Sequence, residues 1–326
     1  MMDKSAANAY VYAKVCGKLS NAYFGQRAQN LYAAKSLTEL YNILFKGDVP
    51  AIPENLLAKK IEEKAERRFV KEYCSLLECY SNPEKILLTL LQFYDYDNLK
   101  EIGGALCLKE TERPYILDLK RYAILNYDKW PDIKKITEGS ELAWYNTVPN
   151  ISNQQVLDTK LDFQYLRKLW QSVNEIEYSC REEVCKLFSR EIEFSNILWT
   201  LRLMVYYKMN PEEIMNHLFF ENPSLRESDR FARESIKLLK KDPNDFKDWK
   251  DWKFNYLLNP HEEGVIWEVD PRWVENSINA VLIKNYSTAF HRFPLTSLSL
   301  VCYFKIKHNE LDNIRRVTED LRLGGQ

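Results

Sequence analysis

Hydrophobic positions recur at helical spacing along most of the chain. From residue 54 to about residue 80, apolar side chains step mainly by four and form one stripe: Leu57, Ile61, Ala65, Phe69, Tyr73 and Leu77. The opposite side carries mixed charges such as Lys60, Glu63 and Lys71, which is typical of a solvated helix face. Pro53 stands just before this run, where a proline favours the start of a helix. The pattern therefore predicts a long amphipathic helix.

Other helix starts are marked by a capping residue next to a proline. The four such pairs are Asn82-Pro83, Asn210-Pro211, Asn222-Pro223 and Asp270-Pro271. Ser36, with Glu39 three residues later, has the spacing of a capping box. Strand signals are scarce, because residues 113–119 and 265–269 are only short candidates and no Asn-Gly or Asp-Gly hairpin turn occurs. The predicted fold class is all-α.

A short pattern, acid-x-x-Asn-aliphatic, occurs three times. Its members are Asp95, Asn98 and Leu99; Glu193, Asn196 and Ile197; and Glu310, Asn313 and Ile314. The spacings between successive Asn residues are 98 and 117, and a predicted helix begins 40 to 44 residues before each. These matching flanks predict three related helical units, over residues 1–112, 113–210 and 211–326. Units of this size are too large for a thin solenoid, so we expect three lobes around a pseudo-threefold axis.

The motif itself has a structural interpretation. The acid and the Asn three residues later lie on one face of a helix, and the aliphatic neighbour points inward. Asn is unfavourable inside a helix, so a recurring Asn is expected to hydrogen-bond the backbone of a neighbouring segment. We therefore favour a structural role for the three Asn residues over contact with a ligand.

Composition and charge narrow the possible functions. The chain has 326 residues, with 46 Lys and Arg against 47 Asp and Glu, which argues against nucleic-acid binding by bulk phosphate attraction. Only 9 Gly are present, and no GxxxxGK[ST] motif occurs, so a phosphate-binding loop is not expected. Nucleic-acid binding through local basic patches remains possible.

Neither a membrane span nor a secretory signal is evident. No run reaches the roughly 18 apolar residues that a bilayer crossing requires, and the first residues, MMDKSAANAYVYAKV, lack an apolar signal core. The 7 Cys are dispersed, and the five-residue spacings of Cys74 with Cys79 and of Cys180 with Cys185 do not converge on a helix face. We expect reduced thiols and a cytosolic protein.

Six segments carry a family resemblance. They read YVYAKV at 10–15, SLTELYNIL at 36–44, YDYDNLK at 94–100, NILWTLR at 196–202, WEVDPRWVE at 267–275 and KHNELDNIR at 307–315. In this order, and across nearly the whole chain, they resemble the C-type subunit of the archaeal and bacterial V/A-type ATPases. Its eukaryotic counterpart is the d-type subunit, and the two form the AC39 family.

The resemblance implies a funnel-shaped, all-helical adaptor without catalytic activity. Members of this family lie on the cytoplasmic face of the membrane, on the proteolipid ring, and receive the tip of the central stalk. The expected partners are therefore central-stalk subunits of the D/F type and the proteolipid ring, between which the adaptor passes torque. No cofactor, metal or small-molecule substrate is implied.

Candidate partner contacts are polar or aromatic residues near the motifs. The charged candidates are Lys100, Arg202, Arg315 and Arg316, for which an intramolecular ion pair is the alternative interpretation. Trp249 and Trp252, three residues apart in DFKDWKDWKF, are expected to be exposed and to contact ring loops or lipid headgroups.

Two other classes compete with the adaptor. An all-α terpene synthase needs clustered carboxylates for Mg²⁺, and Asp95-Tyr-Asp97 lacks the third acid. The four His residues show no paired ligand spacing: 217, 261, 291 and 308. We expect no catalytic, cofactor-binding or metal-binding residue. A generic helical scaffold for other partners remains the alternative function, because a fold alone does not define a function.

Overall fold

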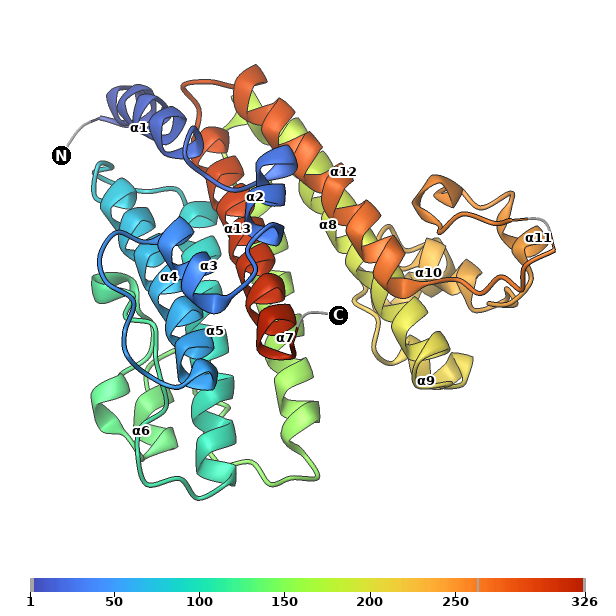
Figure 1. Cartoon of the computed structure of the whole chain (residues 1–326), viewed down its shortest axis with the longest axis horizontal. Helices are drawn as coiled ribbons and strands as arrows, with labels where there is room; N and C mark the ends of the chain where they lie inside the picture. The colour runs from blue at the N-terminus through green and yellow to red at the C-terminus, as the bar shows by residue number, and fades with distance from the viewer. Residues whose placement is uncertain (1–2, 263, 325–326) are drawn as a thin grey trace. The chain divides into compact units, whose positions relative to one another are not determined.

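Helices predominate in the residues that the structure describes. The computed structural model describes residues 3–262 and 264–324; no strand occurs in these residues, and the predicted all-α class is confirmed (Figure 1). The chain divides into two compact units. Unit 1 contains the residues up to Arg181 and from Ser287 onwards, and unit 2 contains Glu182–Tyr286. Three lobes around a pseudo-threefold axis, with bounds at 112 and 210, stay a prediction.

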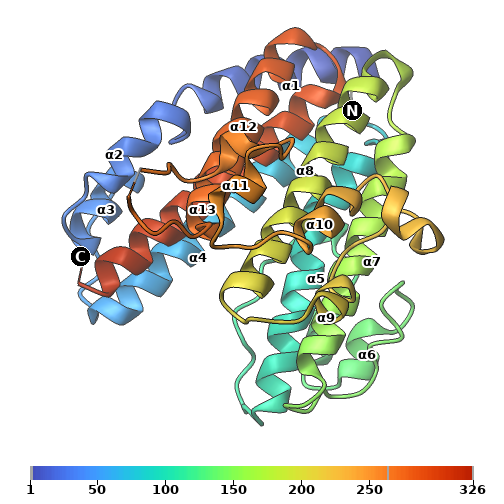
Figure 2. The same cartoon turned by 90° about the vertical axis from the view of Figure 1, so that its right-hand side faces the viewer.

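Unit 1 is built on two pairs of long helices. Helix α4 (Glu54–Leu77) packs along α13 (Ser297–Arg322), and α5 (Lys85–Cys107) packs along α7 (Gln154–Asn174), as Figures 1 and 2 show. Helix α1 (Lys4–Leu19) also lies against α13. These helices enclose the main hydrophobic core of this unit.

The apolar stripe predicted on α4 is the side that packs. All six of its members are buried, with at most 4% of any side chain exposed. The rings of Phe69 and Tyr73 meet Phe304 of α13, at centroid distances of 5.3 and 5.0 Å. Lys60 and Lys71, on the opposite side, are exposed. Because burial of each large apolar side chain contributes about 1.5–3 kcal/mol, the stripe holds this helix in place.

Short helices connect α1 to α4. They are η1 (Gly25–Ala28), α2 (Gln29–Tyr32) and α3 (Leu37–Leu44). The capping box predicted at the start of α3 is half formed. The Glu39 N–H donates to Ser36 Oγ at 3.2 Å, but the Glu39 carboxylate accepts from the Lys35 N–H at 2.8 Å. The Glu39 carboxylate thus binds the Lys35 N–H, one residue before the Ser36 N–H that a complete capping box would use.

The chain between α5 and α7 is mostly irregular. It contains η2 (Lys120–Tyr122), η3 (Tyr127–Lys129) and α6 (Ile133–Thr137). Residues 113–119, a short strand candidate, are extended but pair with no other strand in the described ranges. An extended segment without a strand partner must satisfy its buried backbone groups with side chains.

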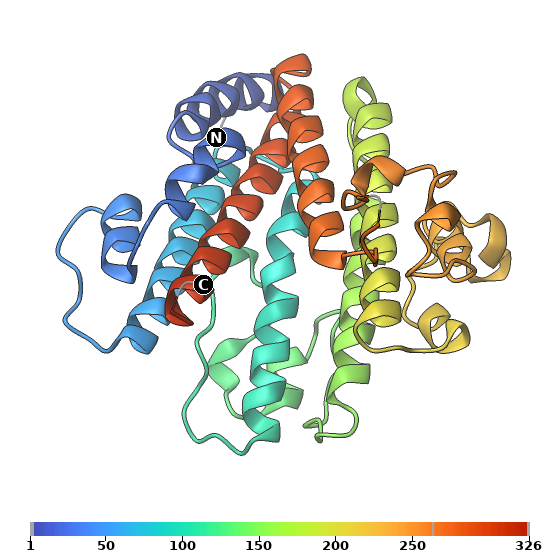
Figure 3. The same cartoon turned by 45° about the vertical axis from the view of Figure 1, so that its right-hand side comes forward.

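Unit 2 is organised around parts of α8 (Tyr178–Val205) and α12 (Pro271–Arg292), which run antiparallel within it. Arg202 pairs with Glu275 at 2.6 Å, and the Tyr286 hydroxyl donates to the Glu191 carboxylate. The connecting chain forms short helices, which gather beside this pair (Figure 3): α9 (Pro211–Met215), η4 (Pro223–Ser228), α10 (Arg233–Leu238), α11 (Phe246–Trp249) and η5 (Asn255–Leu257).

Candidate functional site

The three copies of the motif lie on three long helices. The first is on α5, the second on α8 and the third on α13. Their aliphatic members, Leu99, Ile197 and Ile314, are all buried, with at most 1% of each exposed. The aliphatic member of each motif copy therefore faces inward on its helix.

Asn98 fastens the extended segment after α5 to that helix. Its Nδ2 donates to the Leu117 carbonyl at 2.9 Å, and its Oδ1 accepts from the Leu117 N–H at 3.0 Å. Nδ2 also donates to the Tyr127 hydroxyl, at 2.9 Å. We call this arrangement, in which one Asn bonds both backbone groups of a single residue, a backbone clamp.

Asn196 forms a second backbone clamp in unit 2. Its Oδ1 accepts from the Phe219 N–H at 2.9 Å, and its Nδ2 donates to the Phe219 carbonyl at 2.8 Å. The same Nδ2 reaches the Phe231 carbonyl at 3.0 Å. Both Asn residues thus make the predicted bonds to neighbouring backbone, and the same local device occurs in both units.

The third motif differs in detail. Asn313 is partly exposed; its Oδ1 accepts from the Tyr32 hydroxyl at 3.2 Å, and no backbone bond to it is seen in the described residues. The backbone contact is made instead by the acid, because the Tyr23 N–H donates to Glu310 at 2.7 Å. The third motif therefore takes its partners from the N-terminal part of the chain.

The three motif acids have different electrostatic environments. Asp95 is fully buried and accepts from the Ile124 N–H at 3.0 Å and from the Tyr127 hydroxyl; burial raises the pKa of this carboxyl to about 6. Glu193 pairs with Arg190 at 3.2 Å. Glu310 contacts Lys307, whose pKa burial lowers to about 8. These contacts are internal, which favours a structural role for the motif.

Three of the predicted interface cations tie neighbouring helices together. Lys100 of α5 pairs with Asp162 of α7 at 2.5 Å. Arg315 of α13 pairs with Glu66 of α4 at 2.7 Å, and Arg202 joins α8 to α12 through the ion pair described above.

Exposure differs among these cations, and Arg316 has a different setting. Arg315 keeps 51% of its side chain exposed, so it remains accessible to a partner. Arg316 lies beside Tyr32, where its charge counteracts the rise in the pKa of the tyrosine caused by burial. An intramolecular partner is therefore present for the cations that were candidates for partner contact.

The prediction that Trp249 and Trp252 are exposed is wrong. Only 0% and 4% of their respective side chains are exposed. The Trp249 indole N–H donates to the Asp242 carbonyl at 2.7 Å, and its ring lies 6.1 Å from that of Trp267. The two residues are core residues of unit 2, because this connecting region has few long helices and fills its interior with aromatic rings.

An exposed aliphatic surface was missed by the sequence reasoning. It lies where α5 ends and α7 begins, and Gly104 of α5 is close to Gln154 there (Figures 1 and 3). The surface, which we call the α5–α7 end, consists of Leu108, Val148, Ile151 and Val156, whose side chains are 49–84% exposed. Residues 146–157 contain no charged side chain, and this feature of the sequence could have indicated an apolar surface.

The loop within the α5–α7 end is well ordered by side-chain bonds. Asn150 Oδ1 accepts from the Ser152 N–H and the Asn153 N–H, both at 3.0 Å, and Asn153 Oδ1 accepts from the Asn150 N–H at 2.8 Å. Ile151, at 84% the most exposed residue of this surface, is thus presented by a fixed turn. Such a preorganised apolar residue is suited to anchor a partner.

Neither a metal cluster nor a membrane span occurs in the described ranges. Residues 3–262 and 264–324 hold no group of three or more His, Cys, Asp or Glu side chains that could bind a metal ion. Within these residues, no helix is both long enough and apolar enough to cross a bilayer.

Comparison with known proteins identifies a family and a relative. The family model described as "ATP synthase (C/AC39) subunit" matches residues 11–324. An uncharacterized protein of Treponema pallidum (strain Nichols) is 25% identical over 327 residues, which cover 99% of this chain and 95% of the relative.

Proposed function

The chain belongs to the ATP synthase (C/AC39) subunit family, and on this premise we propose that it is the central-stalk adaptor of a V/A-type ATPase. In this role it links the rotary shaft, through subunits of the D/F type, to the membrane proteolipid ring. It passes torque between ATP turnover and ion transport while carrying no catalytic site itself. We place it on the cytoplasmic face of the membrane, as a peripheral subunit.

The observation that carries this proposal is the extent of the family match. It spans residues 11–324, so both compact units belong to the matched region. A family of non-catalytic ATPase subunits also accords with the internal contacts of the motif residues, which leave Asn98 and Asn196 bonded to backbone rather than free for chemistry.

The contacts within each unit suit a part that transmits force. Ion pairs join α4 to α13 and α5 to α7 in unit 1, and α8 to α12 in unit 2. The backbone clamps fasten irregular segments to α5 and α8. Each fastening limits the internal deformation that would otherwise absorb a twisting load.

We further propose that the α5–α7 end contacts the proteolipid ring. A membrane-embedded ring offers apolar and weakly charged surfaces, and the α5–α7 end is aliphatic and charge-free over residues 146–157. Ile151 is the expected anchor, because burying its exposed side chain contributes about 1.5–3 kcal/mol.

Affinity purification tests the adaptor role. The tagged chain, isolated from its own cells in mild detergent, should bring down the V-type catalytic, central-stalk and proteolipid subunits. Recovery of a well-folded chain with neither stalk nor ring subunits would refute the role. Recovery with an unrelated complex would support the alternative, a generic helical scaffold.

Site-specific photo-crosslinking tests the ring contact. A photoreactive amino acid at position 151 should crosslink to the proteolipid, whereas the same group at the exposed Lys59 of α4 should not. If position 151 gives no more proteolipid adduct than position 59 in the intact complex, the proposed contact is wrong.

A further inference from the structure

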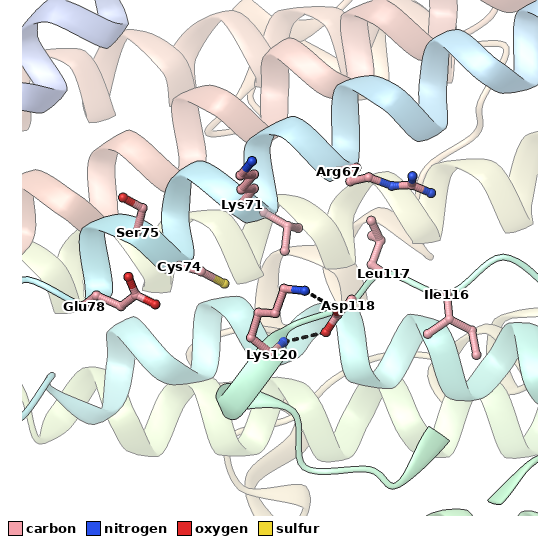
Figure 4. Close-up of a pocket in the computed structure, with 10 residues that line it drawn as sticks. Arg67, Lys71, Cys74, Ser75, Glu78, Ile116, Leu117, Asp118 and Lys120 are labelled. Atoms are coloured by element: carbon pink, nitrogen blue, oxygen red, sulfur yellow. Dashed lines mark hydrogen bonds and ion pairs between the residues drawn. The ribbon is translucent and has the colours of Figure 1, made fainter. Parts of the chain in front are cut away.

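A pocket lies along α4 in unit 1. Its volume is about 620 Å³, which is within the usual range for small-molecule sites. Figure 4 shows the residues that line it: Arg67, Val70, Lys71, Cys74 and Ser75 from α4, Glu78 directly after that helix, and Ile116, Leu117, Asp118 and Lys120 from the segment after α5. We call it the α4 pocket.

The wall of the pocket opposite α4 is the segment after α5, and residues 115, 117 and 119 of this segment each form a hydrogen bond to α4 or α5. The Tyr115 hydroxyl donates to the Glu63 carbonyl at 3.1 Å, and Leu117 is held by the Asn98 clamp. The Cys74 thiol donates weakly to the Leu119 carbonyl at 3.9 Å. Because the wall is fastened to both α4 and α5, the pocket is preformed and does not need to open for a ligand.

Lys120 adds a backbone feature to this wall. Its φ is +57°, in the left-handed region that residues other than glycine seldom adopt. Asp118 supports this conformation, since its carboxylate accepts from the Lys120 N–H at 2.8 Å and pairs with the Lys120 ammonium at 2.5 Å (Figure 4). Strained residues that are held in this way are concentrated at binding sites.

The charges of the α4 pocket are unevenly satisfied. Lys120 is paired with Asp118, but Arg67 and Lys71, one helical turn apart, have no carboxylate partner among the described residues. Arg67 instead stacks on the Tyr115 ring, at 5.3 Å from its centroid. Arg67 and Lys71 therefore add positive charge to one end of the pocket.

The pocket floor is apolar. Val70, Cys74 and Leu117 contribute it, and each is at most 6% exposed. Burial raises the pKa of the Cys74 thiol to about 11, so this group stays neutral near pH 7. Glu78 lies about two helical turns beyond Lys71, and its carboxylate would repel a second negative charge at that end.

We propose that the α4 pocket binds an amphipathic monoanion, with its charged end beside Arg67 and Lys71 and its aliphatic chain along the apolar floor. The ligand class is a medium-length acyl chain with one anionic group. Both a free fatty acid and an anionic membrane lipid have this chemistry. Nucleotides and other polyanions are disfavoured, because the Glu78 carboxylate would repel further negative charge at its end of the pocket.

Calorimetric titration with decanoate, below its micelle concentration, tests the proposal on the full chain. We expect saturable binding that is at least tenfold weaker in the double variant Arg67→Ala with Lys71→Ala, since each charge-assisted contact is lost. The control is Lys59→Ala with Lys60→Ala, an exposed pair on the same helix, which should bind as the unaltered chain does. Decanol and inorganic phosphate, each carrying half of the chemistry, should bind more weakly than decanoate.

A second variant and a second ligand complete the test. Ser75→Trp places a large ring at the exposed edge of the pocket and should abolish decanoate binding while leaving the circular dichroism spectrum unchanged. Sedimentation with phosphatidylglycerol vesicles distinguishes a membrane lipid from a free acid, because only the former predicts vesicle binding that depends on Arg67 and Lys71. Absence of saturable binding to both decanoate and vesicles would overturn the proposal, as would equal losses in the test and control pairs.

Discussion

Replacing Asn98 by Ala should destabilise unit 1 far more than Asn313→Ala does. The Asn98 side chain is 4% exposed and provides both hydrogen-bond partners of Leu117, which is 6% exposed. Without it, one buried N–H and one buried carbonyl lose their partners. Each of these two unsatisfied groups costs about 1–3 kcal/mol, so we expect a loss of roughly 2–6 kcal/mol in the free energy of unfolding.

Asn313 and Asn196 provide the comparisons. Asn313 is partly exposed and bonds side chains, so water can replace it and Asn313→Ala should cost only about 0–1 kcal/mol. Asn196 holds three buried backbone groups, of Phe219 and Phe231, so Asn196→Ala should cost about as much as Asn98→Ala, but in unit 2.

Hydrogen exchange read by mass spectrometry is the appropriate assay, together with urea unfolding. A chain with two compact units need not unfold in a single step, so a local measurement is required. In Asn98→Ala the peptides around Leu117 should exchange faster while those around Phe219 do not, and Asn196→Ala should give the reverse. If Asn98→Ala cost less than Asn313→Ala, or left exchange at Leu117 unchanged, the backbone clamp would not be the reason for the motif.

Three further predictions concern other residues. Trp249→Ala should cost about 3–5 kcal/mol in unit 2, because it removes a fully buried ring; urea unfolding measures this, and a loss below about 1 kcal/mol would contradict a core position. The pKa of Asp95 is raised to about 6 in the folded chain. The stability that the protonated carboxyl contributes to the folded state is therefore fully present below about pH 4 and is lost as the pH rises through 6. Thermal unfolding from pH 5 to pH 7 should thus show a decrease of roughly 1 kcal/mol that is absent in Asp95→Asn; identical profiles would argue against it. Ile151→Asp should reduce recovery of the proteolipid in purifications at least tenfold while Ile151→Ala reduces it less, and equal recovery from both variants would exclude an apolar anchor.

The helices of unit 1 were accessible from the sequence because their apolar residues recur at a fixed step. The α4 stripe predicted the buried side residue by residue, since a single long helix needs only its own period to define a face. The starts of α9 and α12, in unit 2, were predicted from another local signal, a capping residue next to a proline. Local rules suffice where local geometry determines which side is buried.

The Trp residues of unit 2 show where such rules fail. Trp249 lies on a helix of four residues, Phe246–Trp249, flanked by Lys and Asp, and so short a helix has no period to read. Its burial depends on Trp267 and other distant residues, which the charged neighbours in the sequence do not reveal. Flanking charges indicate exposure only when the segment has a regular face to place them on.

The residues that the motif binds could not be predicted from the sequence either. The presence of an Asn in the motif nevertheless has a physical explanation. Leu117 and Phe219 lie 19 and 23 residues after their Asn, in irregular segments with no common pattern.

Such a segment, buried against a helix, cannot bond its N–H and carbonyl to that helix, whose backbone groups are already used. Asn offers one acceptor and two donors on a short side chain, so it can satisfy both groups from within the helix. The helix-propensity penalty of about 0.7 kcal/mol is smaller than the cost of leaving either group unpaired, so a buried helical Asn is favoured wherever an irregular segment crosses the helix. At α13 the acid bonds the backbone instead, and there Asn313 is free to lie at the surface.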